Sequence, residues 1–166
     1  AVYENEKLVR KLDFIANKKL KLFLNELLKK SKWNERYDLH IDQRIGLINF
    51  STIGRNCPRE ARNRYFKWDK LNKERDLICK KIENEFPHLE ASVGGEISID
   101  IYPKGKNKAQ VLDEIKGPIL FFGDKCEKGG NDYPIAYRLE NEKNERIYKV
   151  HNVKNYSETW EILKKY

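Results

Sequence analysis

An unbroken apolar run at residues 119–122 ends in Gly123 and is followed at once by Asp124. A short run of Ile, Leu and Phe predicts a strand buried on both faces of a sheet, as in parallel α/β folds. Ligands of open α/β sheets bind at the carboxyl ends of the strands, which is where Asp124 would lie. The Gly-Gly-Asn-Asp segment at 129–132 offers further oxygen atoms to a hard cation. Asp124 and Asp132 are therefore the first candidates for chemistry.

The pattern changes near Tyr102. Before it, helices and alternating strands predict an α+β unit with an antiparallel sheet, whereas helix and strand alternate beyond it as in parallel α/β sheets. The expected order is a hairpin in residues 1–12, a helix over 17–31, strands near 39–41 and 47–50, helices after Pro58 and over 72–86, strands within 89–102, a helix over 108–115, the strand 119–122, a loop, a strand over 146–150 and a helix from 157.

The chain carries a net charge of +8, from 34 Lys and Arg against 26 Asp and Glu. This balance suits a polyanionic partner, but the lysines are spread over predicted helices and turns and form no basic stripe interleaved with aromatics, so we expect no nucleic-acid surface. Three cysteines without a C-x-x-C pair indicate a reducing compartment. No apolar run approaches the roughly 20 residues of a membrane span, so we expect a cytoplasmic protein without membrane contact.

Arg44, Arg55 and Arg62 fall around predicted strand and loop ends and a helix start. A guanidinium matches phosphate bidentately and stays charged, so three converging arginines would hold a phosphate firmly. Spacing does not establish convergence, and each arginine alone is more often a solvated surface residue. Ser98 and Asp100 share the polar face of one strand, which is typical either of an exposed strand or of a site that reads sugar hydroxyls.

Lys108, at a predicted helix start, would join Asp124, Asn131 and Asp132 in a magnesium-dependent phosphoryl-transfer site. In such a site the protein supplies positioning and charge neutralisation. A charge at the end of a buried strand is costly unless something pairs with it, which favours a functional role for Asp124. Cys126 lies near these residues, but no histidine is close to it in the sequence. We therefore interpret Cys126 as a thiol without a catalytic role.

Three separated segments resemble eukaryotic-type phosphomannomutases, of the haloacid dehalogenase superfamily, in colinear order. They are Arg-x-Gly-Leu-Ile-Asn-x-Ser-x-Ile-Gly-Arg at 44–55, Gly-Gly-Glu-Ile-Ser-Ile-Asp-Ile-Tyr-Pro at 94–103, and Phe-Phe-Gly-Asp-Lys at 121–125 with Gly-Gly-Asn-Asp at 129–132. The resemblance implies an α/β fold: a partial haloacid dehalogenase-like core with a parallel sheet, plus an α+β cap domain with an antiparallel sheet. Residues 1–13 would be a remnant of a core edge hairpin, residues 14–102 the cap, and residues 103–166 the C-terminal part of the core.

The same resemblance implies roles for the candidate residues. In that family cap arginines hold the substrate phosphate, a serine and an aspartate contact the sugar, a lysine neutralises the aspartyl phosphate, and an acid with its supporting residues holds Mg²⁺. By position these would be Arg44, Arg55 and Arg62 for the phosphate, Ser98 and Asp100 for the sugar, Lys108 for the aspartyl phosphate, and Asp124, Asn131 and Asp132 for the metal.

The chain also departs from the family. The family's nucleophile and acid/base residue lie in an Asp-x-Asp-x-Thr motif, and no Asp-x-Asp occurs in this sequence. We expect that roughly the first third of a core is absent and that the chain is inactive alone, because the covalent route needs that nucleophile. Lys104 stands where the family usually places an acid before glycine. Residues 133–144 differ from the family's loop, so the resemblance does not extend to a second, structural cation.

The function that the resemblance implies is interconversion of mannose 6-phosphate and mannose 1-phosphate, through a phosphoaspartyl enzyme and a hexose 1,6-bisphosphate, feeding GDP-mannose synthesis. The cap of that family also forms a homodimer. Two alternatives stay open from the residues. One is a haloacid dehalogenase-type sugar phosphatase, and the other is a non-catalytic binder of sugar phosphates or polyanions.

Overall fold

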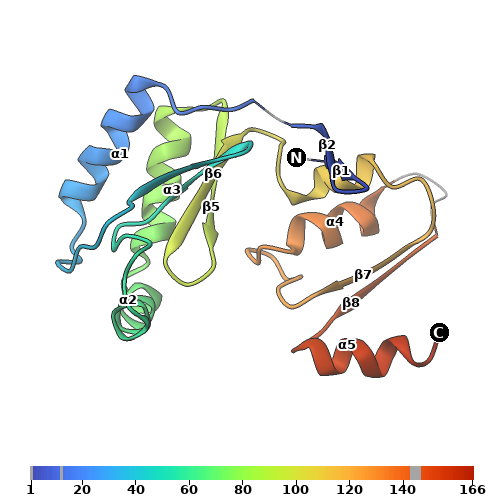
Figure 1. Ribbon diagram of the computed structural model, residues 1–166. Coiled ribbons are helices and arrows are strands. Elements are labelled where there is room, and N and C mark those ends of the chain that lie inside the picture. The colour runs from blue at the N-terminus through green and yellow to red at the C-terminus, as the bar shows by residue number, and fades with distance from the viewer. Residues whose placement is uncertain (1, 12, 143–146) are drawn as a thin grey trace. The chain divides into compact units, whose positions relative to one another are not determined.

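Two sheets of different kinds organise the chain, which has a mixed α/β fold (Figure 1). The structure is a computed structural model that describes residues 2–11, 13–142 and 147–166. The chain divides into two compact units, Ala1–Lys104 and Gly105–Tyr166. The first unit holds the strands β1 (Val2–Glu4), β2 (Lys7–Arg10), β3 (Ile41–Arg44), β4 (Leu47–Phe50), β5 (Leu89–Gly94) and β6 (Ser98–Pro103), and the helices α1 (Lys18–Lys30), α2 (Arg59–Asn72) and α3 (Glu74–Glu85).

The first two strands form an antiparallel hairpin, as the sequence predicted. Its turn residues Asn5 and Glu6 both have positive φ angles, of 47° and 65°. Two consecutive left-handed residues are typical of the tight turn whose twist matches that of the flanking strands. The predicted hairpin also took in Ala1 and Leu12, which lie outside the described residues.

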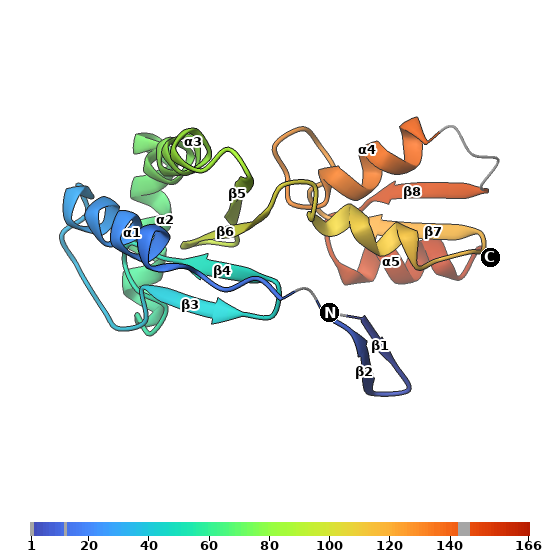
Figure 2. The ribbon, with the colours of Figure 1, turned by 90° about the horizontal axis from the view of Figure 1, so that it is seen from above.

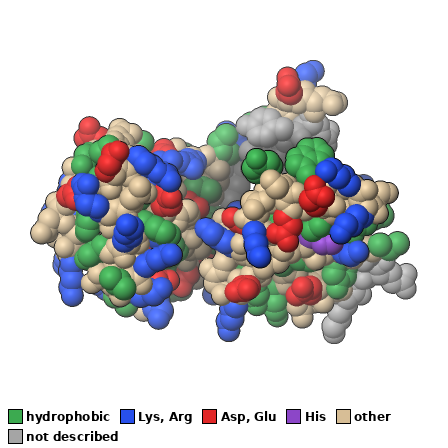
Figure 3. All heavy atoms as spheres, turned by 90° about the horizontal axis from the view of Figure 1, so that it is seen from below, with side chains coloured by type: hydrophobic (Ala, Val, Ile, Leu, Met, Phe, Trp, Pro, Cys, Tyr) green, Lys and Arg blue, Asp and Glu red, His purple; other side chains and the backbone are tan. Residues whose placement is uncertain are grey.

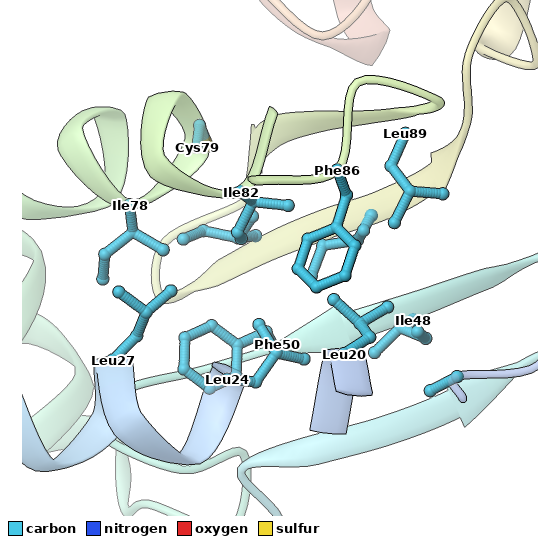
Figure 4. Close-up of a cluster of buried hydrophobic side chains, with 13 residues drawn as sticks. Leu20, Leu24, Leu27, Ile48, Phe50, Ile78, Cys79, Ile82, Phe86 and Leu89 are labelled. Atoms are coloured by element: carbon cyan, nitrogen blue, oxygen red, sulfur yellow. The ribbon is translucent and has the colours of Figure 1, made fainter. Parts of the chain in front are cut away.

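The main sheet has the order β3-β4-β6-β5, and all its neighbouring strands are antiparallel (Figure 2). Side chains alternate between the faces of a strand, so apolar residues at every second position form one apolar face. Helices α1 and α3 supply the residues that pack on this face, and Figure 4 shows the two helices pointing side chains at each other and at the sheet. This core contains Leu20, Leu24 and Leu27 of α1, Ile78, Ile82 and Phe86 in and after α3, and Ile48, Phe50, Ile99 and Ile101 of the sheet.

Helix α1 begins where the sequence provides a cap. The side chain of Asn17 accepts a hydrogen bond from the backbone N–H of Leu20 at 2.9 Å. This bond satisfies one of the backbone donors that every helix leaves unpaired at its start. Three leucines at helical spacing then bury one side of α1, and lysines occupy the other side. The predicted amphipathic helix over residues 17–31 is therefore confirmed.

A buried ion pair joins α2, α3 and the turn between β5 and β6. Asp69 and Arg75 have side chains that are only 5% and 4% exposed, and the Arg75 Nε lies 2.7 Å from an Asp69 carboxylate oxygen. Arg75 Nη1 also donates to the carbonyl oxygens of Gly94, Gly95 and Ser98, at 3.3 to 3.4 Å. Because both charges have partners, their burial is tolerated and the hairpin turn is tied to the helices.

The second unit contains a small parallel sheet of β7 (Ile119–Gly123) and β8 (Tyr148–Asn152). Parallel pairing after residue 102 was predicted and is confirmed. The 3₁₀ helix η1 (Lys108–Asp113) and helix α4 (Tyr133–Asn141) bury Ala109, Leu112, Ile135 and Leu139 together. Ile119, Phe121 and Val150 pack against this cluster from the sheet, and helix α5 (Tyr156–Leu163) follows β8.

Four predictions for this unit were wrong in detail. Strand β7 is not buried on both faces, since Leu120 is 36% exposed and, within the described residues, β7 pairs with β8 alone. The region after β7 is not only a loop, because Pro134 at the first turn and three buried apolar residues form α4. The helix predicted over residues 108–115 is a short 3₁₀ helix that ends at Asp113. The predicted strand over 146–150 is displaced to Tyr148–Asn152, and Arg146 lies outside the described residues.

Candidate functional site

A row of polar side chains crosses the whole width of the main sheet. Asp42 of β3 lies opposite Asn49 of β4, Asn49 opposite Asp100 of β6, and Asp100 opposite Ser92 of β5. Residues in register on neighbouring strands share a face, so all four lie on the face that does not carry the apolar core. The sheet therefore has one apolar face and one face that presents oxygen and nitrogen atoms.

Arg55 reaches this row from the loop after β4. Its Nη1 donates to Asn49 Oδ1 at 2.6 Å and to Ser98 Oγ at 3.3 Å, while its Nε lies 3.4 Å from a carboxylate oxygen of Asp42. The side chain is 29% exposed, so it is held by these contacts while remaining open to solvent. Arg55 thus contacts side chains from three neighbouring strands of the sheet.

Arg44 and Arg62 approach the same group. Arg44 Nε donates to the same carboxylate oxygen of Asp42 at 2.9 Å, so Arg44 and Arg55 share one anionic partner. Arg62, on α2, donates to the backbone carbonyl of Arg55 at 3.4 Å. Spacing in the sequence could not establish that these arginines converge, and the strand register and the path of the loop bring them together.

Asp100 joins the group through an amide and needs space beside it. Asn49 Nδ2 donates to Asp100 Oδ1 at 2.6 Å. A Cβ at Gly94 would lie 2.7 Å from Asp100 Oδ2, so glycine at this position leaves room for the carboxylate. The five residues predicted in this unit, Arg44, Arg55, Arg62, Ser98 and Asp100, therefore lie in one group.

Two members of the group were not among the predicted site residues. Asp42 and Asn49 both lie in the polar row, and each contacts Arg55. The available signal was local: Asn49 lies between two apolar residues and Asp42 follows an apolar one, which places both on the polar face. Because a single strand does not reveal its partner's register, this signal could not tell which residues they contact.

The second unit brings three of its four predicted residues together at the carboxyl end of β7. Lys108 Nζ lies 3.0 Å from Asp132 Oδ1, and the backbone N–H of Asp124 donates to Asp132 Oδ2 at 3.2 Å. A Cβ at Gly123 would lie 3.0 Å from the Cβ of Asp132, so the loop folds closely onto the strand end. Asp132 is 15% exposed and holds the lysine and the start of the loop in place.

The electrostatics of Asp132 favour its charged form. Partial burial by itself would raise the pKa of this carboxyl, but the hydrogen bond and positive charge of Lys108 act in the opposite direction. Backbone hydrogen bonds at Lys125 and Asp124 act in the same direction, so the pKa lies below its ordinary value. Burial raises the pKa of the nearby Cys126 thiol, as do Asp132 and Asp124, which disfavours the reactive thiolate.

The oxygen atoms at this end of β7 are of the kind that Mg²⁺ prefers. The Asp124 carboxylate is exposed, and Asn131 Oδ1 is buried without a hydrogen-bond partner among the described residues. Such an orphaned oxygen suits a hard cation that is bound through one or two carboxylates and water. A hollow of about 270 Å³ lies here, lined by Asp124, Lys125, Glu127, Lys128, Gly130 and Asn152. Within the described ranges, His, Cys, Asp and Glu side chains form no cluster of three that could hold a metal by themselves.

Outside these two groups, charged side chains are mixed with side chains of other types. On the face drawn in Figure 3, lysines and arginines lie among acidic and hydrophobic side chains rather than in one continuous patch. In the described part of the chain, no helix is both long and apolar enough to cross a bilayer. The two groups of polar residues described above therefore remain the principal candidates for function.

The fold and these groups define a mixed α/β protein that has arginines gathered on an antiparallel sheet and a lysine–aspartate pair at the end of a parallel strand. The chain belongs to the eukaryotic phosphomannomutase family, whose model matches residues 5–165. It is 39% identical over 131 residues to a phosphomannomutase of Spinacia oleracea, which covers 73% of this chain and 52% of that protein. A phosphomannomutase of Dendrobium officinale is 36% identical over 146 residues, covering 80% of this chain and 57% of that protein. The chain thus spans about half the length of these curated relatives.

Proposed function

We propose that the protein is a phosphomannomutase, which interconverts mannose 6-phosphate and mannose 1-phosphate and feeds GDP-mannose synthesis. The observation that carries the proposal is that Arg44 and Arg55 already share an anionic group, the Asp42 carboxylate, in the same group as Ser98 and Asp100. A phosphate offers more oxygen atoms and more charge than a carboxylate to the same guanidinium groups. Family membership supports the same substrate class.

In this proposal the first unit contains the cap that holds the sugar phosphate. Arg44, Arg55 and Arg62 would grip the phosphate, and Ser98 and Asp100 would bind hydroxyls of the sugar ring. A carboxylate and a hydroxyl on one strand face can accept from and donate to vicinal sugar hydroxyls. Residues 14–102 would form this cap, residues 1–13 a remnant of a core edge hairpin, and residues 103–166 part of a haloacid dehalogenase-like core.

The second unit would contribute to the phosphoryl-transfer site. Asp124 would bind Mg²⁺, and Asn131 and Asp132 would support it. When bound, the cation supplies charge neutralisation for the transferring phosphoryl group. Lys108 would add a second positive charge on the reacting phosphate, and its pairing with Asp132 at 3.0 Å keeps the ammonium group positioned at the strand end.

The covalent route through a phosphoaspartyl enzyme and a hexose 1,6-bisphosphate needs a nucleophile. No Asp-x-Asp occurs in the 166 residues, so we propose that this chain binds hexose phosphates but does not turn them over alone. A coupled assay that follows mannose 6-phosphate formed from mannose 1-phosphate tests this. We expect no turnover, and turnover by the purified chain would overturn the statement that it is inactive alone.

Binding is the direct test of the site. Isothermal titration calorimetry of the chain with mannose 1-phosphate should show saturable binding that Arg55→Gln weakens about tenfold or more, because a charged hydrogen-bond donor is lost. Lys116→Gln removes one positive charge at an exposed position in the other unit and serves as the control, with unchanged affinity expected. Equal effects of the two variants would mean that the arginine group is not the ligand site.

Two alternatives make different predictions. A sugar phosphatase would release inorganic phosphate from mannose 1-phosphate, which a phosphate assay detects. A non-catalytic polyanion binder would prefer nucleic acid or heparin, with an affinity that falls steeply as salt rises.

We further propose a cytoplasmic homodimer formed through the cap, without nucleic-acid or membrane partners. Light scattering of the purified chain, expected to give twice the monomer mass, tests the dimer.

A further inference from the structure

Asn49 lies in the polar row between two charged side chains, Arg55 and Asp100. The residue is 3% exposed. Its Oδ1 accepts a hydrogen bond from Arg55 Nη1, and its Nδ2 donates to Asp100 Oδ1, both at 2.6 Å. A guanidinium only donates and a carboxylate only accepts, so the amide fits between them in one orientation. Asn49 is therefore fixed by two charged groups of opposite sign.

We propose that Asn49 is a positioning residue that couples the phosphate-binding Arg55 to the hydroxyl-binding Asp100. The two ends of a sugar phosphate would then be recognised by one connected group rather than by two independent side chains. The identity of the ligand rests on the proposed function, whereas the coupling itself rests on the two hydrogen bonds.

The interposed amide also keeps both charged residues available to a ligand. Arg55 and Asp100 have opposite charges, and a direct bidentate pair would occupy the donors and acceptors that a ligand needs. With Asn49 between them, Arg55 uses Nη1 for Asn49 and Ser98, and its Nη2 has no hydrogen-bond partner among the described residues. Asp100 likewise makes one hydrogen bond through Oδ1 and keeps further acceptor capacity on a partly exposed side chain.

The surrounding structure holds the amide in this place. Asn49 is in register with Asp42 on one side and Asp100 on the other, so the backbone of three strands determines its position. Its neighbours Ile48 and Phe50 are fully buried in the apolar core, which anchors β4. Because the backbone is anchored from the opposite face, changes at Asn49 should alter the site more than the fold.

The test uses two variants of the whole chain. Asn49→Leu has a similar volume but neither hydrogen-bonding group, and Asn49→Asp keeps an acceptor for Arg55 while losing the donor to Asp100. Thr52→Val is the matched control, because it removes one buried hydrogen bond of the same unit, from Thr52 Oγ1 to Tyr65 Oη at 2.6 Å, without touching the row. Circular dichroism confirms that each variant is folded.

Two readouts distinguish positioning from a general structural role. The first is the ¹⁵N–¹H NMR signal of the Arg55 Nε group in the free protein. Asn49→Leu should shift it measurably, because the guanidinium loses its 2.6 Å hydrogen bond and keeps only its contacts with Asp42 and Ser98, and Asn49→Asp should shift it less. The second is affinity for mannose 1-phosphate by calorimetry, which should fall about tenfold or more in both variants and stay unchanged in Thr52→Val.

The outcomes separate this inference from the proposed function. If the unaltered chain binds no mannose 1-phosphate, the proposed function fails, and the Arg55 signal alone decides the coupling. If Asn49→Leu leaves both the Arg55 signal and the affinity unchanged, the inference is wrong. If Thr52→Val weakens binding as much as Asn49→Leu, the effect comes from lost stability and the inference is likewise overturned.

Discussion

The buried pair of Asp69 and Arg75 gives the sharpest expectation for stability. The substitution Arg75→Met keeps most of the side-chain volume but leaves the Asp69 carboxylate, 5% exposed, without its positive partner. It also removes the donor to the carbonyls of Gly94, Gly95 and Ser98. Breaking one partner of a buried ion pair costs about 3–5 kcal/mol, because the remaining charge is uncompensated. This is a large fraction of the roughly 5–15 kcal/mol by which domains are stable.

Urea unfolding measures the effect. For a slope of about 2 kcal/mol per M, a loss of about 4 kcal/mol moves the midpoint down by about 2 M. Trp33 and Trp68 lie within 6 Å of Tyr65, beside the pair, and report on this unit. The third tryptophan, Trp160, is 61% exposed in the other unit, so a Trp160→Phe background removes its signal.

The matched control is the same substitution at an exposed ion pair. Arg59 lies 3.1 Å from Glu96, but its side chain is 67% exposed. Arg59→Met should cost less than about 1 kcal/mol, because water already screens this pair. Adding Asp69→Leu to Arg75→Met should recover much of the lost stability, since an apolar pair removes the buried charge. Equal midpoint shifts for Arg75→Met and Arg59→Met would refute the reasoning.

Three further expectations concern the two sites and the buried thiol. Asp42→Asn removes the carboxylate shared by two arginines, so affinity for inorganic phosphate should rise about fivefold by calorimetry; a fall would mean that Asp42 only orients the arginines. The pKa of Asp132 is lower in the folded chain than in the unfolded chain, so its charged form stabilises the fold at pH values above the unfolded pKa of about 3.9. This contribution is lost as the pH falls through the folded pKa. Lys108→Met should therefore move acid unfolding of its unit to higher pH by circular dichroism, and an unchanged midpoint would contradict the pairing. Burial raises the pKa of Cys79 to about 12, so iodoacetamide at pH 8 should alkylate it only on unfolding, as mass spectrometry would show.

Patterns within single segments predicted most of the first unit. The 3.6-residue spacing of apolar residues gave α1, and the period of two gave the strands and their apolar face. These signals are local, since they depend on how one segment exposes its own side chains. They also predicted the switch from antiparallel to parallel pairing, because the order of helices and strands differs between the two parts.

The second unit shows where a local pattern misleads. Four consecutive apolar residues at 119–122 predicted burial on both faces, but the pattern does not say how many neighbours the strand has. Ile119 and Phe121 pack against η1 and α4, whereas Leu120 remains 36% exposed on the other side. The helix α4 was missed because Gly129 and Gly130, a few residues before it, favoured a loop, although Pro134 at the first turn was a start signal.

The arginine group illustrates a limit of a different kind. The residue types of Arg44 and Arg55 were sufficient to suggest anion binding, yet their meeting at Asp42 depends on the register of β3 with β4 and on the course of the loop after β4. Asn49 was harder to find, because a lone amide between two core residues has no chemical signature of its own. Its importance follows only from the two charged side chains that the sheet places on either side of it. A site built on a sheet is thus predictable in its residue types and its face, whereas the contacts that make it one connected group arise from strand pairing.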